Sequence, residues 1–232
     1  FILHNGEINT IKGNTDAMLA REESISSSIM QDDMNKILPI INTSGSDSAM
    51  LDNALEFMVM NGMDLPLAVM ITIPEPWENN KNISPKKRDF YQYYATMLEP
   101  WDGPASILFS DGDVMGAVLD RNGLRPARYL ITHDGMMVVA SEAGVISFEA
   151  EKIKEKGRLQ PGKILMVDTE EGRIYYDGEL KEQLAAAKPY RQWLSANRIE
   201  LDALKSGRKV ANTVDDYDRR LRAFGYTRED VE

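Results

Sequence analysis

The second half of the chain repeats one pattern, in which two short apolar or β-branched runs are joined by a loop that contains glycine. The paired runs are residues 105–109 and 114–119, residues 129–132 and 136–141, and residues 164–168 and 173–176. Glycine in each loop permits the positive φ that tight hairpin turns require. The spacing therefore predicts successive antiparallel hairpins and argues against a doubly wound parallel sheet.

The first half of the chain has helical periodicity instead. Over residues 48–60 the apolar side chains recur at the spacing of one helical face, and Asn61-Gly62 supplies a left-handed stop. Over residues 84–98, Ser84 can cap a helix whose first residue is Pro85. Both segments are predicted to be helices, and helices followed by an antiparallel meander predict an α+β fold.

Three other segments complete this half. Residues 3–8 are predicted to be the end of a strand that runs into a loop, and the apolar, β-branched residues 65–73 predict a further strand. Residues 10–23 predict a helix. Its expected buried side chains are Ile11, Ala17, Met18 and Leu19.

After the hairpins the sequence predicts helices again, over residues 178–187 and, beyond Pro189, over residues 190–204. The last segment, residues 212–232, is highly charged and has an apolar stripe at helical spacing. The residues of this stripe are Val214, Tyr217, Leu221 and Phe224.

Composition excludes several functions. The net charge is −10, which argues against nucleic-acid binding, and the basic cluster at residues 86–88 is interpreted as a solvated helix face. No apolar run approaches the roughly 18 residues of a membrane span. The 232 residues include no cysteine, and His4 and His133 lack the spacing of metal ligands. We therefore expect no metal and no cofactor in this chain.

His4-Asn5-Gly6 is the first candidate for chemistry. An Asn side chain and the next backbone N–H can both donate to an oxygen that gains negative charge during acyl transfer, and glycine lets the backbone approach a substrate closely. The same Asn-Gly pair is also a common turn signal. The dipeptide alone leaves both interpretations open.

Ser46-Asp47-Ser48 is the second candidate. A carboxylate at the junction of a loop and a helix can bind the ammonium group of an amino acid through charge-assisted hydrogen bonds. Alternatively, Asp47 or a flanking serine caps the helix that begins near Ala49. The two roles are compatible, because the helix can fix the loop that presents the carboxylate.

Residues 99–104 and 120–126 form a third group, rich in Gly, Pro, Asp and Arg. Their composition is typical of structural turns tied together by charged side chains. Arg121 and Arg125 could instead shape the rim of an active site, and neither is expected to be catalytic.

The whole string from His4 to Asn14 resembles the oxyanion segment of class II (N-terminal nucleophile) glutamine amidotransferases. Residues 99–104, 187–194 and 223–227 resemble, more narrowly, the amidotransferase part of glutamate synthases. The resemblance implies that Asn5 and Gly6 are the oxyanion-hole donors and that Asp47 holds the α-amino group of glutamine. The fold it implies is the later part of an αββα sandwich of the N-terminal nucleophile hydrolases, with antiparallel sheets between helical layers.

Such enzymes attack the amide with an N-terminal cysteine, which also serves as its own base. This chain has no cysteine, so we expect it to be inactive alone and to be the later portion of a catalytic domain. Residues 1–195 are expected to be that partial domain, and residues 196–232 a helical linker to the next domain. The arginine that grips the glutamine carboxylate is expected in the earlier portion.

By resemblance, the parent enzyme hydrolyses L-glutamine to glutamate and ammonia, and uses the ammonia for reductive amination of 2-oxoglutarate in the cytoplasm. FMN and an iron–sulfur cluster are expected in its other domains, and its partners are those domains and an electron-donor subunit or ferredoxin. Two alternatives remain open: a degenerate scaffold or glutamine-binding module without catalysis, and another class II amidotransferase.

Overall fold

The computed structural model describes residues 1–204, 216–227 and 229–230, and the chain divides into two units, residues 1–196 and 197–232. The helices are α1 (Ile11–Glu22), α2 (Met34–Ile37), α3 (Asp47–Met60), α4 (Leu65–Thr72), α5 (Pro85–Tyr94), α6 (Asp177–Ala186), α7 (Tyr190–Asn197) and α8 (Tyr217–Ala223). The strands are β1 (Ile2–Gly6), β2 (Ala105–Ser110), β3 (Val114–Leu119), β4 (Arg128–Thr132), β5 (Met137–Ala140), β6 (Ile153–Arg158), β7 (Ile164–Asp168) and β8 (Arg173–Tyr176). Single 3-10 turns lie at Gln31–Asp33, Ala150–Lys152 and Leu201–Leu204.

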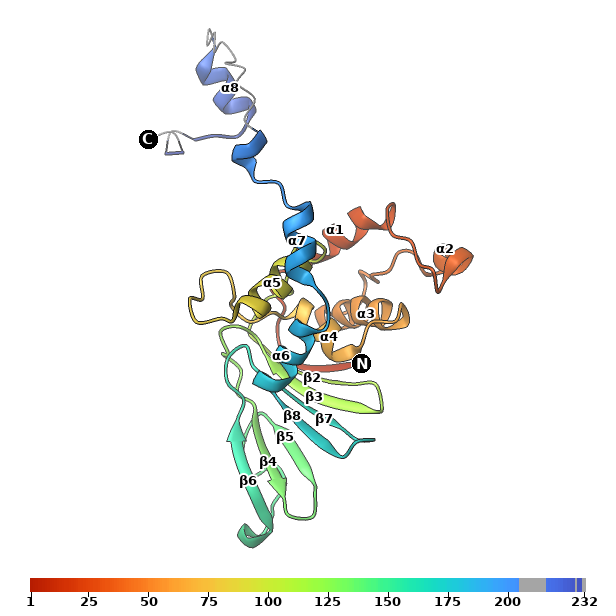
Figure 1. Ribbon diagram of the computed structural model, residues 1–232, viewed down its shortest axis with the longest axis vertical. Coiled ribbons are helices and arrows are strands. Elements are labelled where there is room, and N and C mark those ends of the chain that lie inside the picture. The colour runs from red at the N-terminus through yellow and green to blue at the C-terminus, as the bar shows by residue number, and fades with distance from the viewer. Residues whose placement is uncertain (205–215, 228, 231–232) are drawn as a thin grey trace. The chain divides into compact units, whose positions relative to one another are not determined.

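The strands form two antiparallel sheets (Figure 1). One sheet has the order β1-β2-β3-β7-β8, and the other has the order β5-β4-β6. The three predicted hairpins are β2–β3, β4–β5 and β7–β8, and their loops contain Gly112, Gly135 and Gly172, all with positive φ. The predicted α+β class with antiparallel sheets is therefore confirmed.

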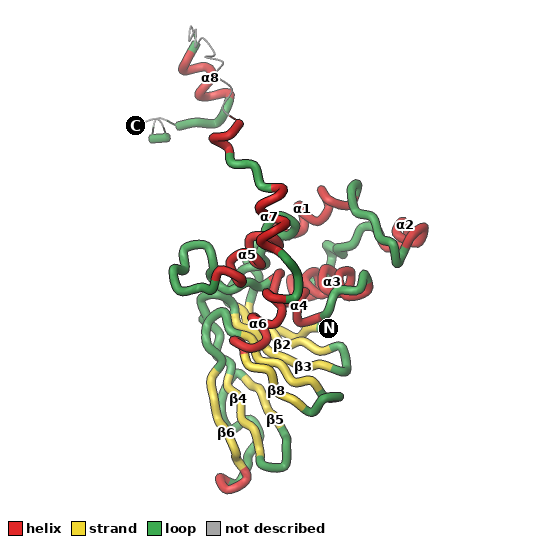
Figure 2. The backbone as a smooth tube through the Cα atoms, viewed as in Figure 1, coloured by secondary structure: helices red, strands yellow, loops and turns green. Residues whose placement is uncertain are grey.

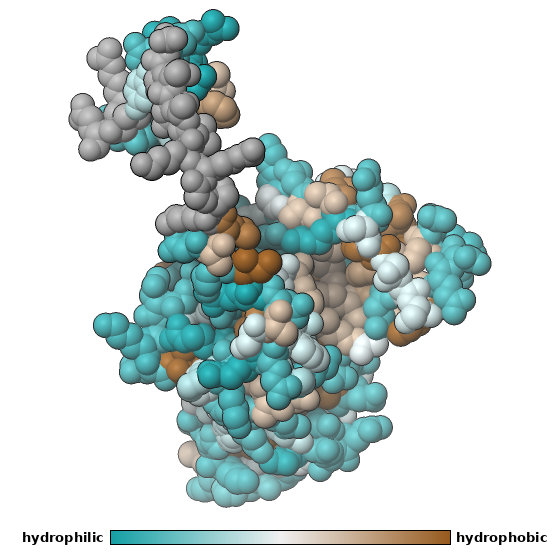
Figure 3. Space-filling model, turned by 45° about the horizontal axis from the view of Figure 1, so that its top comes forward, coloured by the Kyte–Doolittle hydropathy of each residue, from teal (hydrophilic) through white to brown (hydrophobic). Residues whose placement is uncertain are grey.

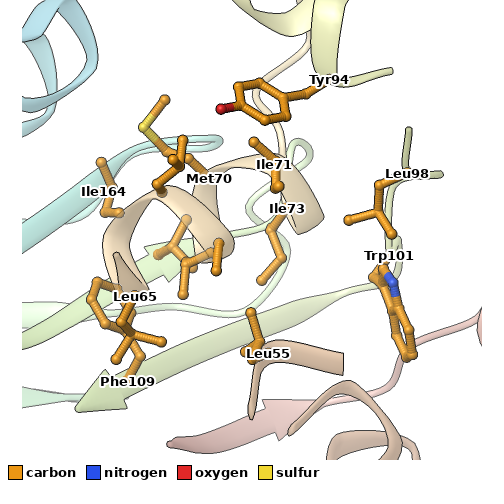
Figure 4. Packing of buried hydrophobic residues seen from close by; sticks show 14 of the residues in the cluster. Leu55, Leu65, Met70, Ile71, Ile73, Tyr94, Leu98, Trp101, Phe109 and Ile164 are labelled. Atoms are coloured by element: carbon orange, nitrogen blue, oxygen red, sulfur yellow. The ribbon is translucent and has the colours of Figure 1, made fainter. Parts of the chain in front are cut away.

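The alternation of side chains along β2 places the larger sheet between two layers. Ile107 and Phe109 point into the main core, where they pack with α3 and α4 (Figure 4). Leu108, between them, packs instead in a second core with residues of β4 and β5. Helices therefore cover one face of the five-stranded sheet, and the three-stranded sheet covers part of the other (Figure 2).

Residues 65–73 were predicted to be a strand, and this prediction is wrong. Residues 65–72 of this segment form α4, and every residue of that helix is buried. A helix that is buried on all sides is apolar on all sides, so its sequence lacks the periodicity that separates a helix from a buried strand. Pro66, in the first turn of α4, was the local signal for a helix start.

Two details of the other elements also differ from expectation. Leu19 of α1 is 40% exposed, and α1 instead buries Asn14 and Thr15 beside Met18. The Asn14 side chain donates to the carbonyl of Pro100 at 3.1 Å, so this face of α1 docks through hydrogen bonds as well as apolar contact. The six-residue strand β6 was not predicted.

A buried charge cluster connects three segments of the first unit: the loop at Glu75, the chain at Gly162 and Lys163, and α6. Lys181 of α6 is 2% exposed, and its Nζ lies 2.7 Å from Asp177, 3.3 Å from Glu75 and 2.6 Å from the carbonyl of Gly162. Lys163, just before β7, contacts the same two carboxylates. Because each buried charge has an opposite charge beside it, the cluster can be held in the interior.

In the second unit, Tyr217 and Leu221 of the predicted apolar stripe lie in α8, and Phe224 directly follows that helix. The fourth residue of the stripe, Val214, lies outside the described residues.

The surface shown in Figure 3 is mainly hydrophilic, with apolar residues gathered in patches. Within the described ranges, no helix has the length and apolar character needed to cross a membrane. The assignment of residues 196–232 to a linker and the cytoplasmic location stay predictions.

Candidate active site

Asn5 and Gly6 lie at the end of β1, the edge strand of the five-stranded sheet. They pair with Ser106 and Ala105 of β2 in antiparallel register. The pair is thus part of a strand, and the alternative of a hairpin turn does not apply.

Gly6 is the residue whose identity the backbone requires. Its φ is +149°, and a Cβ at this position would lie 2.0 Å from the carbonyl oxygen of Pro104 and 2.7 Å from Cα of Ala105. Both obstructing atoms belong to the backbone. Only glycine lets β1 pass the start of β2 at this distance.

The hydrogen-bond pattern shows where the N–H of Gly6 points. The N–H of Glu7 donates to Pro104 at 3.3 Å, and Ser110 donates to the carbonyl of Phe1 at 2.8 Å, so the odd-numbered residues of β1 bond to β2. Because the direction alternates along a strand, the N–H of Gly6 points to the outer edge of the sheet. The exposed side chain of Asn5 has no hydrogen-bond partner among the described residues. Both predicted donors therefore remain able to bind a ligand.

Asp47 is the first residue of α3, but it is not the residue that caps the helix. Ser46 does so, since its hydroxyl accepts from the N–H of Ala49 at 3.2 Å. One oxygen of Asp47 accepts from the N–H of Ser48 at 2.8 Å, and the other accepts from the N–H of Ile8 at 2.8 Å. Asp47 thus connects α3 to the chain just beyond the two predicted donors.

The His4 side chain of β1 also lies beside the Asp47 carboxylate. Its Nε2 lies 3.4 Å from the Asp47 oxygen that also binds Ile8. Burial raises the pKa of Asp47, but the N–H groups of Ile8 and Ser48 and the His4 ring outweigh that effect, so this pKa lies below its ordinary value. The carboxylate is therefore ionised at neutral pH and can attract a cation.

Residues 99–104 and 120–126 contact the chain just after β1 and the first residue of β2. The carbonyl of Asp102 accepts from the N–H of Asn9 at 2.8 Å, and a Cβ on Gly103 would lie 2.0 Å from the carbonyl of Glu7. Asp120 is 3% exposed and accepts from the N–H of Ala105, the β2 partner of Gly6, at 3.2 Å. These contacts favour the structural interpretation of both segments.

Among the described residues, neither Arg121 nor Arg125 has a hydrogen bond or ion pair with Asn5 or Asp47. Arg121 forms an ion pair with Asp102 at 2.5 Å, beside a 440 Å³ pocket that Trp77 and Trp101 help to line. Arg125 is exposed. A role for either arginine at an active-site rim stays a prediction.

Three contributors were missed from the sequence: the His4 ring, the N–H of Ile8, and Asp52, which accepts from the N–H of Ile2 at 3.1 Å. Only His4 could have been identified from the sequence, because alternation along a strand places its side chain on the opposite side from Asn5. In the structure this side faces the helices. No group of side chains in the described ranges could hold a metal ion. A cysteine-ligated iron–sulfur cluster cannot be held by a chain without cysteine.

Comparison with known proteins gives a consistent picture. The family described as glutamine amidotransferases class-II matches residues 1–193. The glutamate synthase [NADPH] large chain of Bacillus subtilis is 48% identical over 100% of this chain and 15% of its own length. A glutamate synthase [NADH] of Schizosaccharomyces pombe is 48% identical over 98% of this chain and 11% of its own length.

A plant protein is similar over the same region. The chloroplastic ferredoxin-dependent glutamate synthase 2 of Arabidopsis thaliana is 45% identical over 100% of this chain and 14% of its own length. This chain therefore spans 11–15% of the length of these three relatives.

Proposed function

The chain belongs to the class II glutamine amidotransferases, and on this basis we propose that it forms part of the glutaminase site of a glutamate synthase. The reaction is hydrolysis of L-glutamine to glutamate and ammonia, and the ammonia then serves reductive amination of 2-oxoglutarate. The names of the three relatives support this choice within the family.

The observation that carries the proposal is the position of the two donors. The N–H of Gly6 points to the outer edge of the sheet, and the neighbouring Asn5 carboxamide is exposed and unbonded within the described residues. When a nucleophile attacks the amide carbon of glutamine, the amide oxygen gains negative charge in a tetrahedral adduct. Donors already held in place stabilise this charge without reorganisation. Collapse of the adduct, with a proton supplied to the leaving nitrogen, releases ammonia.

Asp47 supplies recognition of the substrate in this proposal. Its carboxylate is ionised and about a quarter exposed, and each oxygen has one backbone N–H partner. Each carboxylate oxygen can accept two hydrogen bonds, so capacity remains for the α-ammonium group of glutamine. The attraction between opposite charges makes this a strong contact for an amino-acid substrate.

The nucleophile must come from residues other than these 232, because none of them is a cysteine. We therefore expect this chain by itself not to hydrolyse glutamine. The partners in the proposal are the remaining domains of a glutamate synthase and an electron-donor subunit or ferredoxin. FMN and an iron–sulfur cluster would belong to those domains.

A chimera tests the proposal directly. The 232 residues replace the matching segment of the Bacillus subtilis large chain, and glutamate formation is measured with glutamine and, separately, with ammonia. Ammonia bypasses the glutaminase site, so activity with ammonia shows that the rest of the chimera is folded. Activity with both nitrogen donors supports the proposal. Activity with ammonia alone would indicate a scaffold or a binding module.

Single substitutions in the chimera then test the two roles. Asn5→Ala should lower kcat with glutamine by roughly 10²–10³-fold, with a smaller change in KM, as for the loss of one oxyanion donor. The matched control is Asn35→Ala, because Asn35 is an exposed residue of α2. Unchanged turnover in the Asn5 variant would remove Asn5 from the oxyanion hole.

Asp47 needs two variants, because its carboxylate also binds the N–H of Ile8. Asp47→Asn keeps an oxygen acceptor for that N–H but loses the charge, so it should mainly raise KM for glutamine. Asp47→Ala loses both functions and should also lower kcat. Normal saturation of the Asn variant at low glutamine would count against ammonium recognition.

A further inference from the structure

His4 has a buried ring nitrogen that its surroundings leave without a hydrogen bond. The side chain is 10% exposed, and Nε2 is one of two buried side-chain nitrogen or oxygen atoms without a hydrogen-bond partner in the described part of the chain. A buried polar atom in this state normally costs about 1–3 kcal/mol, so its retention needs an explanation.

The charged group beside this nitrogen is the carboxylate of Asp47, whose Oδ2 lies 3.4 Å from Nε2. This separation is an electrostatic contact, and an approach of about 0.5 Å would turn it into a hydrogen bond of ordinary length. The Asp47 oxygen that faces His4 is the same oxygen that accepts from Ile8. His4 therefore lies where it can restrict the rotation and position of this carboxylate.

His4 is also directly bonded to Asn5, the proposed oxyanion donor. The two side chains lie on opposite sides of β1, with His4 towards the helices and Asn5 exposed. The ring therefore lies on the other side of the strand from the Asn5 carboxamide. Any role of His4 in the reaction must pass through Asp47 or through the backbone of β1.

We propose that His4 is a positioning residue, whose Nε2 holds the Asp47 carboxylate between the N–H of Ile8 and the α-ammonium group of the substrate. This inference rests on the proposed glutaminase function. His4 fixes the charged end of glutamine relative to the strand that carries Asn5 and Gly6. Substrate recognition and oxyanion stabilisation then share one rigid connection.

Two variants of His4 separate positioning from space filling. His4→Gln retains an N–H donor at about the position of Nε2, whereas His4→Leu fills the space without a donor. In the chimera, His4→Leu should raise KM for glutamine about tenfold with a smaller change in kcat, the effect of losing one hydrogen bond to a charged group. His4→Gln should stay within about threefold of the parent KM. His133→Leu is the matched control, since His133 is exposed in the β4–β5 loop.

Inhibition constants give a second readout that a purely structural role would not move. L-glutamate carries the α-ammonium group that Asp47 binds, and glutarate is the same dicarboxylate without it. His4→Leu should weaken inhibition by L-glutamate about tenfold and leave inhibition by glutarate unchanged. Equal weakening for both ligands, or an unchanged KM for glutamine, would overturn the positioning role.

The outcomes also distinguish this inference from the proposed function. Glutamine-dependent activity in the parent chimera, together with an unaffected His4→Leu variant, overturns only the role of His4. A parent chimera that uses ammonia but not glutamine overturns both. A His4→Gln variant as impaired as His4→Leu would show that the donor atom is not what matters, and would also overturn the proposal.

Discussion

Gly6→Ala is the sharpest test of how the candidate site is built, because it can be made in the 232-residue chain itself. A Cβ at residue 6 would lie 2.0 Å from the carbonyl oxygen of Pro104, whereas real Cβ atoms essentially never approach other atoms within 3.0 Å. The backbones of β1 and β2 must therefore separate by about 1 Å. No side-chain rotation can relieve the contact, since the atoms that obstruct it are backbone atoms.

The expected cost has two parts. Alanine at a φ of +149° is strained by about 1–3 kcal/mol, and the forced contact adds about 1–3 kcal/mol, as for other overpacked sites. The total, about 2–6 kcal/mol, is a large share of the roughly 5–15 kcal/mol by which native domains are stable. Gly13→Ala is the matched control, because a Cβ at this helical position has nothing within 4 Å. It should stabilise the protein by about 0.5–1 kcal/mol.

Thermal unfolding followed by tryptophan fluorescence measures both variants. The three tryptophans all lie within residues 1–196, so the signal reports the unit that contains β1. At about 2–4 °C per kcal/mol, Gly6→Ala should lower Tm by about 5–20 °C and Gly13→Ala should raise it by a few degrees. A Gly6→Ala protein as stable as the Gly13→Ala protein would refute the close approach of β1 and β2.

Three further predictions concern stability and use the same fluorescence signal in urea. Lys181→Met leaves Glu75 and Asp177 without their most buried cation and should cost about 3–5 kcal/mol; a loss below 1 kcal/mol would contradict the buried cluster. Burial raises the pKa of Asp177, but Lys181 and hydrogen bonds outweigh this effect, so the pKa of Asp177 in the folded protein is lowered. The ionised Asp177 therefore stabilises the fold fully above about pH 4, and this contribution is lost as pH falls through the folded pKa. The loss of stability in acid should be smaller in the Lys181→Met protein, because without Lys181 the folded pKa of Asp177 lies closer to its unfolded value, and an identical pH profile would contradict the pairing. Asn14→Ala removes the buried hydrogen bond to Pro100 and should cost about 1–3 kcal/mol, whereas no change would show that α1 docks by apolar contact alone.

The elements that the sequence predicted correctly are those specified by local chemistry. Ser84 caps α5 by accepting from the N–H of Lys87, and Gly62 ends α3 with a φ of +87°. Gly112 and Gly135 take the positive φ that their hairpins require. In each case the residues that determine the structure are within a few positions of one another, so a single sequence contains the information. Family membership, predicted from the motifs around Asn5, is confirmed by the match over residues 1–193.

The elements that were missed depend on partners distant in sequence. Leu65–Thr72 forms α4 because the sheet and the neighbouring helices bury it on all sides, and an apolar run in the sequence does not reveal that environment. The charged strand β6 exists because it pairs with β4, and Gly157 gives room to the ring of Tyr129. A Cβ at residue 157 would lie 2.2 Å from that ring.

The candidate site shows the same division. The chemistry of Asn5, Gly6 and Asp47 could be proposed from motif and resemblance, but the link between them could not. Ile8 and Asp47 are 39 residues apart, and only the folded chain brings the N–H of one to the carboxylate of the other. The buried position of His4 beside Asp47 likewise follows from the packing of α3 on β1.

The outer edge of β1 explains why α3 carries two carboxylates towards this strand. An edge strand presents unpaired N–H groups, and mobile donors are poor stabilisers of a developing charge. Asp52 binds the N–H of Ile2, and Asp47 binds the N–H of Ile8, so α3 fixes the strand at both ends of its outer edge. Between these two points the N–H of Gly6 still points outward. The strand is therefore rigid at its ends while its proposed oxyanion donor stays accessible, which is the arrangement that preorganised catalysis requires.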